Sequence, residues 1–326
     1  MILSKTPLRI SFAGGGSDYF NKKSNIPGRV ISTTINKYIY ILLNNKHDGK
    51  IRISYSLTEN VNNTNDINHV IIKNSLKYFK IYSGVEIITS ADVPSSGSGL
   101  GSSSALTVGL ANAINKFLIN KKISKKLLSK QACEIEIKKC KKPIGMQDQI
   151  STAYGGLNTI IFKKNKSVTV KKIKISKFRK KNFENNLILF YSGVNRSADH
   201  ILESIKKSGK KFINFEKLSN LAKNFEYELT SGNLDNLGHI LHENWMIKKD
   251  LDIKVSPVNI NQIYEDALSA GAIGGKLLGA GGGGYFLFFV KHENQKKVKK
   301  RLSKLEYINF SFTDTGSKLI KVWYFI

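Results

Sequence analysis

The first 91 residues are dominated by short apolar runs rich in β-branched residues. These runs are the length of strands and are separated by polar or Gly/Pro-containing segments, which predicts strands at residues 8–13, 29–35, 38–43, 51–56 and 85–91. Apolar positions at helical spacing predict helices at residues 67–79, 105–118 and 124–139. Ser124 is a suitable N-cap for the last of these helices. The first half of the chain therefore has an α+β pattern.

A lysine-rich stretch with little periodicity, residues 163–181, follows a strand-like run at 156–162. We interpret this stretch as the boundary region between two domains, residues 1–165 and 166–326, since a chain of 326 residues has the length of about two domains. The second half is then mostly helical. Its patterns predict helices at 197–207, 215–230, 234–248, 257–270 and 293–305, and strands at 187–192, 285–290 and 319–325.

The chain carries a net charge of +28 at pH 7, which raises nucleic acid or an anionic membrane as a partner. Only six of the 52 basic residues are Arg, however, and proteins that read nucleic acids rely on Arg for two-point contacts. The lysines are scattered along the chain among many Asn and Ile residues. We attribute the charge to a coding bias toward these residues, and we expect neither nucleic acid nor a membrane as partner.

No apolar run approaches the roughly 20 residues needed to cross a bilayer, so no membrane span is predicted. The N-terminal residues lack a basic patch followed by an apolar segment, which argues against a secretion signal. The two cysteines, Cys133 and Cys140, cannot form a disulfide scaffold or a four-cysteine zinc site. We therefore expect a cytoplasmic protein with reduced thiols.

Three glycine-rich stretches carry the candidate chemistry, at residues 13–18, 94–105 and 274–284. Glycine allows backbone N–H groups to approach a ligand and tolerates positive φ, so each stretch could bind an anion. Any one of them alone could equally be a flexible turn. The middle stretch is the most informative, because it runs directly into a predicted helix and so places Ser102, Ser103 and Ser104 at a helix N-terminus.

Two common nucleotide-binding motifs do not fit these stretches. The middle stretch has no Lys after Gly101, as a Walker loop would require. The third stretch matches G-x-G-x-x-G over residues 279–284, but a strand follows it where a dinucleotide-binding fold needs a helix. Protein-kinase signatures are also absent. The glycine-rich stretches therefore do not belong to a Walker loop, a dinucleotide-binding fold or a protein kinase.

Taken together and in this order, the three motifs resemble those of the GHMP kinases. They are Pro7-Leu8-Arg9-Ile10-Ser11-Phe12-Ala13-Gly14-Gly15-Gly16-Ser17-Asp18, the stretch 94–105 with Gly99-Leu100-Gly101-Ser102-Ser103 at its centre, and residues 276–284. The resemblance spans nearly the whole chain. It implies an α+β GHMP kinase fold, with an N-terminal domain similar to domain 2 of ribosomal protein S5 and a ferredoxin-like C-terminal domain. It also implies that ATP and substrate bind in the cleft between them.

The resemblance implies an ATP-binding loop and a Mg²⁺ site. The loop comprises Gly97, Ser98, Gly99, Leu100, Gly101, Ser102, Ser103 and Ser104. The expected metal ligands are the Ser103 hydroxyl and the Glu136 carboxylate. Glu134 lies two positions earlier on the same predicted helix, so it faces the opposite side. Only one of the two acids can reach the metal, and the spacing back from Asp148 in the family's motif favours Glu136.

The resemblance also implies roles near the acceptor. Asp148 is expected to be the catalytic base, although it could instead cap a helix beginning at Gln149. Arg9 is expected near the transferring phosphoryl group or the substrate, with a structural ion pair as the alternative. Asp18 is expected to bind sugar hydroxyls. The adjoining glycine-motif residues complete the expected substrate site: Gly15, Gly16, Ser17, Gly281 and Gly282.

Within the family, the motifs look most like those of kinases that phosphorylate the anomeric hydroxyl of a sugar. The expected acceptor is a heptose 7-phosphate, and a fucose-type sugar or another small molecule is the alternative. An acceptor phosphate needs a cation remote from Asp148; Arg196, before a predicted helix N-terminus, is our first candidate and Arg29 our second. A homodimer remains open. The alternative from another class of function is an RNA-binding protein with an S5-like fold, and such a protein would require none of the glycine motifs.

Overall fold

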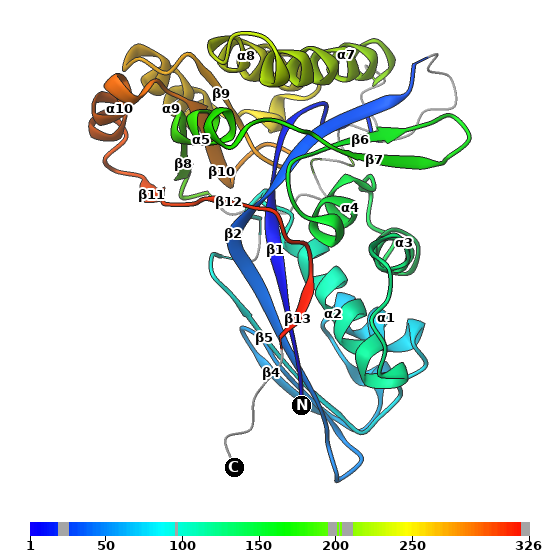
Figure 1. Ribbon diagram of the computed structural model, residues 1–326. Coiled ribbons are helices and arrows are strands. Elements are labelled where there is room, and N and C mark those ends of the chain that lie inside the picture. The colour runs from blue at the N-terminus through cyan, green and yellow to red at the C-terminus, as the bar shows by residue number, and fades with distance from the viewer. Residues whose placement is uncertain (19–25, 95–96, 195–200, 202, 204–210, 321–326) are drawn as a thin grey trace.

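Two β-sheets with helices packed against them form the protein in the computed structural model, which describes residues 1–18, 26–94, 97–194, 201, 203 and 211–320 (Figure 1). The first sheet follows the order β13-β1-β2-β5-β3-β4, with β6, β7 and β12 attached through β2 and β6. Its pairs are antiparallel except β3 with β5. Its strands are β1 (Ile2–Ala13), β2 (Gly28–Asn45), β3 (Ile51–Ser54), β4 (Thr58–Val61), β5 (Val85–Ala91), β6 (Asn158–Phe162), β7 (Val168–Lys172), β12 (Phe312–Thr313) and β13 (Lys318–Ile320).

The two strands predicted at residues 29–35 and 38–43 are one continuous strand, β2. The polar pair Asn36-Lys37 suggested a turn, but it lies at an irregularity in the pairing with β1: Pro7 pairs with Tyr38, whereas Arg9 pairs with Thr34. A bulge of this kind absorbs the extra residues and lets the strand continue. Arg9 thereby sits just beyond the bulge, where β1 approaches the glycine-rich segments.

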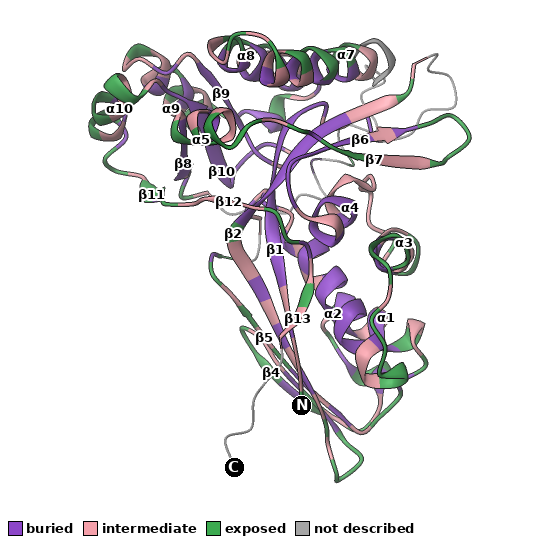
Figure 2. Cartoon of the chain, in the orientation of Figure 1, coloured by how far each residue is buried: buried purple, intermediate pink, exposed green. Residues whose placement is uncertain are grey.

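Helices cover one face of the first sheet (Figure 1). They are α1 (Val70–Tyr78), α2 (Ser102–Ile119), α3 (Lys125–Cys133) and α4 (Gln147–Tyr154), with a short 3-10 turn at Thr64–Asp66. Figure 2 shows that α2 is largely buried, which fits the many small and apolar residues of its sequence. The single helix predicted at 124–139 is α3 followed by a π-helical turn, Glu134–Lys139. Such turns often occur at functional sites.

The second sheet is antiparallel and has the order β11-β8-β10-β9. Large side chains from β10 and two helices form its core, among them Trp245, Tyr264 and Phe288. The helix predicted at 293–305 is shorter than expected, since a 3-10 turn occupies His292–Asn294 and α10 ends at Arg301. Most of α10 is exposed (Figure 2). The elements are α5 (Lys177–Asn185), β8 (Leu187–Tyr191), α7 (Lys211–Thr230), α8 (Asp235–Lys249), the 3-10 turn Ile253–Val255, α9 (Val258–Ser269), β9 (Gly274–Leu277), β10 (Tyr285–Phe289), α10 (Gln295–Arg301) and β11 (Glu306–Ile308).

Segments from the second half of the chain also complete the first sheet. The stretch 163–181 is not irregular, as its sequence suggested, but contains β7, which pairs with β6, and the start of α5. Near the C-terminus, β12 pairs with β2, and β13 pairs with β1. Of the predicted helix at 197–207 the structure describes only residues 201 and 203, and the end of the predicted strand at 319–325 lies outside the described residues. The architecture is α+β, as the sequence predicted.

Among the residues that the structure describes, no helix is long and apolar enough to cross a membrane.

Candidate active site

The middle glycine stretch forms an anion-binding loop at the start of α2. Gly97, Gly99 and Gly101 have φ values of +65°, +75° and +75°, and they alternate with Ser98 and Leu100. Positive φ at alternating positions curls the backbone so that consecutive N–H groups can face one anion. The loop leads into the N-terminus of α2 at residue 102, where the helix dipole favours negative charge. This geometry suits a phosphate chain.

The third glycine stretch packs directly against this loop. A Cβ atom at Gly99 would lie 2.4 Å from the carbonyl oxygen of Leu278, and one at Gly279 would lie 2.6 Å from the Cα of Gly99. The backbone N–H of Tyr285 donates to the carbonyl of Ser98 at 3.1 Å. Two segments separated by about 180 positions thus meet, and their glycines are required because the backbones touch.

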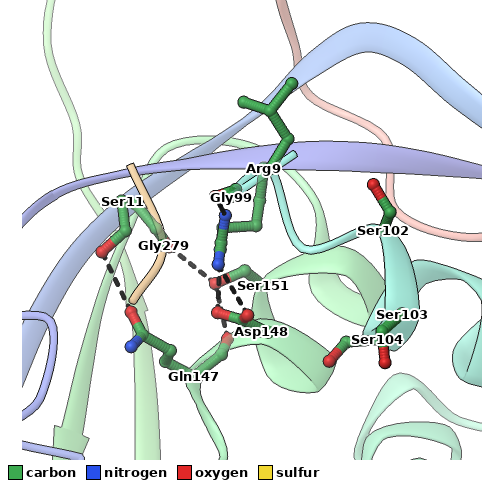
Figure 3. A network of polar contacts seen from close by, with 12 residues as sticks. Arg9, Ser11, Gly99, Ser102, Ser103, Ser104, Gln147, Asp148, Ser151 and Gly279 are labelled. Atoms are coloured by element: carbon green, nitrogen blue, oxygen red, sulfur yellow. Dashed lines mark hydrogen bonds and ion pairs between the residues drawn. The ribbon is translucent and has the colours of Figure 1, made fainter. Parts of the chain in front are cut away.

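Arg9 holds Asp148 beside the loop (Figure 3). Arg9 Nε donates to Asp148 Oδ1 at 2.8 Å and Nη2 donates to Oδ2 at 2.6 Å, while Nη1 donates to the carbonyl of Gly99 at 2.5 Å. The Arg9 side chain is only 4% exposed, against 24% for Asp148. The carboxylate is therefore the more exposed member of the pair. Asp148 lies in the first turn of α4. Its side chain is directed to Arg9 and does not cap a helix beginning at Gln149, which was the alternative.

A second carboxylate, Asp18, lies close to Asp148. It accepts hydrogen bonds from the backbone N–H of Gly16 at 3.1 Å and from the backbone and side chain of Gln147 at 3.1 and 3.2 Å. A Cβ atom at Gly145 would lie 2.0 Å from Asp18 Oδ2, so this approach requires glycine. Burial, followed by the nearby negative charge of Asp148, raises the pKa of Asp18 to about 6. Asp148 and Asp18, the two carboxylates predicted on the acceptor side, are therefore close enough to interact.

Glu136 is completely buried and is surrounded by hydroxyl and amide donors. Ser103 donates to Oε1, Ser104 donates to Oε2 at 2.7 Å, and Gln149 donates to Oε2 at 2.6 Å. Burial raises the pKa of Glu136, although these donors act in the opposite direction. Glu134 instead accepts a hydrogen bond from the hydroxyl of Tyr78. The two acids face different sides, as helical geometry predicted.

The Ser103–Glu136 pair fits a magnesium ion. A hydroxyl and a carboxylate are oxygen donors of the kind that Mg²⁺ prefers, and Mg²⁺ typically takes few protein ligands and completes its shell with phosphate and water. The described residues contain no group of three or more His, Cys, Asp or Glu that could hold a metal by themselves. Such a site would thus depend on the nucleotide phosphates.

A hollow of about 700 Å³ adjoins Ser102 and Ser103 and was not predicted from the sequence. Tyr55 and His69 form part of its wall, with ring centroids 4.8 Å apart. The Glu59 carboxylate fixes this wall by accepting hydrogen bonds from the Tyr55 hydroxyl and the His69 backbone. Its position next to the anion-binding loop suits the base and ribose of a nucleotide. No motif marked these residues, because they come from the loop after β3, the segment before α1 and the end of β5.

Two further residues predicted to bind substrate, Gly15 and Ser17, lie in the first glycine stretch. Gly15 lies near Ser11 and Gln147, whose side chains hydrogen bond at 2.9 Å. Ser17 donates to the carbonyls of Gly14 and Arg29, so its hydroxyl holds the backbone of the first loop.

Gly281, Gly282 and Arg29 contact other parts of the protein. Gly281 and Gly282 pack against Val255, and Gly282 N donates to its carbonyl at 2.6 Å. Arg29 forms an ion pair with Glu226 at 2.8 Å. Arg196 lies outside the described residues.

Two residues of the second half support the first glycine loop and were missed. Lys276 on β9 is buried and donates to the carbonyl of Phe12 at 2.9 Å. Burial, together with the positive charge of Arg9, lowers the pKa of Lys276 to about 7. Asn244 on α8 accepts a hydrogen bond from the backbone N–H of Gly14 at 3.1 Å. Both contacts join residues more than 200 positions apart, so no local signal could reveal them.

Comparison with known proteins identifies the class to which this site belongs. Residues 68–156 match the GHMP kinases N terminal domain, and residues 221–308 match the GHMP kinases C terminal domain. The chain is 33% identical to the D-glycero-alpha-D-manno-heptose 7-phosphate kinase of Campylobacter jejuni over 97% of its own length and 98% of that relative. It therefore belongs to the GHMP kinase family and is an ATP-dependent kinase, as the three glycine motifs predicted.

Solved structures agree with this assignment. A structure titled as a D-glycero-D-manno-heptose 1-phosphate kinase from Bacteroides thetaiotaomicron superposes with a TM-score of 0.80 at 25% identity, covering 99% of this chain and all of that one. A putative sugar kinase from Campylobacter jejuni superposes with a TM-score of 0.79 at 29% identity, covering 98% of each chain. The similarity thus extends over both sheets.

Proposed function

We propose that the protein transfers the γ-phosphoryl group of ATP to the anomeric hydroxyl of D-glycero-D-manno-heptose 7-phosphate, giving the 1,7-bisphosphate for nucleotide-activated heptose synthesis. The observation that carries this proposal is the Arg9–Asp148 pair, which holds a carboxylate beside a phosphate-binding loop. Two similar proteins carry heptose kinase names, one for the 7-phosphate and one for the 1-phosphate. The names support a heptose as the acceptor.

On the donor side, the loop of residues 97–104 would hold the triphosphate, and the hollow beside Tyr55 and His69 would hold the nucleoside. Ser103 and Glu136 would hold a Mg²⁺ ion, which neutralises phosphate charge during transfer. Because Glu136 is buried and fixed by Ser104 and Gln149, its position is set before the nucleotide binds. Preorganised charge of this kind is the main contribution that a protein makes to phosphoryl transfer.

On the acceptor side, Asp148 would accept the proton of the sugar hydroxyl as the hydroxyl oxygen forms a bond to the γ-phosphorus of ATP. The bond between that phosphorus and the bridging oxygen breaks, and ADP leaves. Arg9 fixes the orientation of the carboxylate through two hydrogen bonds. Asp18 would accept hydrogen bonds from neighbouring sugar hydroxyls. Its own donors, from Gly16 and Gln147, hold it on the same side as Asp148.

The phosphate of the acceptor requires a cation away from Asp148. Arg29 already pairs with Glu226, whose negative charge opposes binding of a second anion. This contact weakens Arg29 as a candidate and leaves Arg196 as the first choice. Loss of a charged hydrogen bond to phosphate costs about 1.5 to 3 kcal/mol. Replacing Arg196 by Ala should therefore raise KM for the sugar phosphate about 10- to 150-fold, with little change in KM for ATP.

A panel of acceptors tests the function. Purified protein is incubated with Mg-ATP and, separately, the heptose, its 7-phosphate, its 1-phosphate, L-fucose and galactose; ADP release is followed, and phosphorus NMR locates the new phosphate. We expect the highest kcat/KM for the 7-phosphate, with phosphate added at O1. Equal kcat/KM for the heptose with and without its 7-phosphate would refute the acceptor assignment. Preference for fucose would place the chain with that branch of the family.

A further inference from the structure

Lys142 brings a positive charge to the Ser103–Glu136 pair. Its Nζ donates to Ser103 Oγ at 2.8 Å and lies 3.8 Å from Glu136 Oε1. The Lys142 side chain is 22% exposed, whereas that of Glu136 is 1% exposed. The ammonium therefore lies beside the two expected metal ligands and is more exposed than the buried carboxylate.

The backbone places Lys142 there by a sharp reversal. The π-helical turn ends at Lys139 with Cys140 as its C-cap, and Lys141 has a φ of +56°, in the left-handed region. The chain then folds back, so that the backbone N–H of Lys142 donates to the carbonyl of Glu136 at 3.2 Å. Glu136 and Lys142 are thus held together by main-chain geometry as well as by charge.

An ammonium and a divalent cation cannot both occupy the space next to the two ligand oxygens. Each would contact the Ser103 hydroxyl and the Glu136 carboxylate, and their like charges repel strongly at a separation of a few ångströms. A nucleotide changes this balance, because the phosphate oxygens offer the ammonium a new partner and supply the metal with further ligands.

We propose that Lys142 is a positioning residue that occupies the cation site between Ser103 and Glu136 in the nucleotide-free protein. The divalent ion is then accepted only together with the triphosphate, and the displaced ammonium binds the phosphate oxygens. Lys142 keeps the buried carboxylate neutralised between turnovers and makes metal binding depend on nucleotide. The inference rests on the proposed ATP and metal sites.

Binding of Mn²⁺ tests this inference without an activity assay. Free Mn²⁺ is measured by electron paramagnetic resonance during titration of nucleotide-free protein. Replacing Lys142 by Met should tighten Mn²⁺ binding at least about tenfold, because the competing charge is removed. With a non-hydrolysable ATP analogue present, the wild type should bind Mn²⁺ tightly, and the advantage of Lys142→Met should disappear.

Three further variants decide the interpretation. Lys138→Met removes the same charge four positions earlier, but Lys138 pairs with Glu134 at 3.9 Å, so this variant should bind Mn²⁺ like the wild type. Adding Glu136→Gln to Lys142→Met should abolish the gain. Lys142→Gln retains a donor for Ser103 and serves if the Met variant does not fold. It should show the same gain, and Mn²⁺ should raise its melting temperature more than that of the wild type.

The inference is wrong if both Lys142 variants bind Mn²⁺ as the wild type does in the absence of nucleotide, or if Lys138→Met gives the same gain. This result is separable from failure of the proposed function. A wild type that phosphorylates a sugar phosphate while its Lys142 variants show no gain overturns only the role of Lys142. A wild type that releases no ADP with any acceptor overturns the proposed function, whatever the Mn²⁺ titrations show.

Discussion

Arg9 and Asp148 form a two-point ion pair, with both contacts at 2.6 to 2.8 Å, and the third donor of Arg9 binds the carbonyl of Gly99. The planar guanidinium matches the geometry of a carboxylate, so it fixes the orientation of Asp148 as well as its position. Through Gly99, the same guanidinium also ties Asp148 to the anion-binding loop. One arginine thus sets the distance between the candidate base and the candidate phosphate cradle.

Replacing Asp148 by Asn should lower kcat by about 10²- to 10⁴-fold, since the side chain can no longer accept the acceptor's proton. An anomeric hydroxyl is more acidic than an ordinary alcohol, which favours the lower part of this range. The dissociation constant of ATP should stay close to that of the wild type. Steady-state kinetics and calorimetric ATP binding measure the two quantities. Retention of most of the wild-type kcat would show that Asp148 is not the base.

Replacing Arg9 by Lys keeps the positive charge but removes the two-point contact. We expect kcat to fall by about 10- to 100-fold, because small misplacements of a catalytic group have effects of this size. When Arg9→Lys is combined with Asp148→Asn, it should cause little additional loss of kcat, since both changes disable the same ion pair. Arg52→Lys is a matched control, because Arg52 is half-exposed and pairs with Glu86 away from the site. Additive losses in the double variant would contradict the coupling.

Replacing Glu136 by Gln should raise the Mg²⁺ concentration needed for half-maximal activity by about 10- to 150-fold, as expected for the loss of a charged contact. Ser103→Ala should have a smaller effect, because no charge is lost. Glu134→Gln should leave the Mg²⁺ requirement unchanged, since Glu134 accepts a hydrogen bond from Tyr78. Activity is measured over a magnesium series at saturating ATP. A larger effect at Glu134 than at Glu136 would mean that the metal site has been misplaced.

Gly99 and Gly49 have nearly the same backbone conformation, with φ of +75° and +73°, but different surroundings. A Cβ atom added at Gly99 would lie 2.4 Å from the carbonyl oxygen of Leu278, whereas one added at Gly49 would have no neighbouring atom within 4 Å. Gly49→Ala should cost only the conformational penalty of about 1 to 2 kcal/mol. Gly99→Ala should destabilise the protein further and weaken ATP binding. Thermal denaturation and ATP titration of both variants measure these effects; equal effects would argue against the close approach of the two loops.

Asp18 should make stability depend on pH. Its pKa is raised from 3.8 to about 6 in the folded protein, so the folded state binds the proton more tightly than the unfolded state. The resulting stabilisation is present below the unfolded pKa and is lost as pH rises through about 6. Asn carries no charge to bury. The Asp18→Asn variant should therefore gain stability relative to the wild type between about pH 4 and pH 7, by about 3 kcal/mol at most.

Urea unfolding of both proteins at several pH values measures this gain. A stability difference that does not change with pH would contradict the raised pKa. Asp266→Asn is a control of the opposite sign. In the wild type, the hydrogen bond that Arg301 donates lowers the pKa of Asp266. Asp266 therefore loses its stabilising contribution as pH falls.

The motifs and most of the regular elements were readable from the sequence, because they depend on local chemistry. Glycines at alternating positions before an apolar helix predicted the anion-binding loop, and helical geometry separated Glu134 from Glu136. The strand patterns of β8 and β10 were also clear, since their buried residues form apolar runs. β1 was predicted only from residue 8, because polar residues interrupt its first half. Neither the β9 strand inside the third glycine stretch nor the short strands β4 and β11 gave such a signal.

The tertiary structure decided which distant groups meet. Asn36-Lys37 looked like a turn, but pairing with β1 extends β2 through it. The short strand β12 was not predicted and becomes a strand by pairing with β2, more than 270 positions earlier. Likewise, the contacts of Arg9 with Asp148 and of Lys142 with Ser103 span 139 and 39 positions. Local sequence determines φ, burial pattern and helix ends, whereas hydrogen bonds between distant groups exist only once packing brings both partners out of water together.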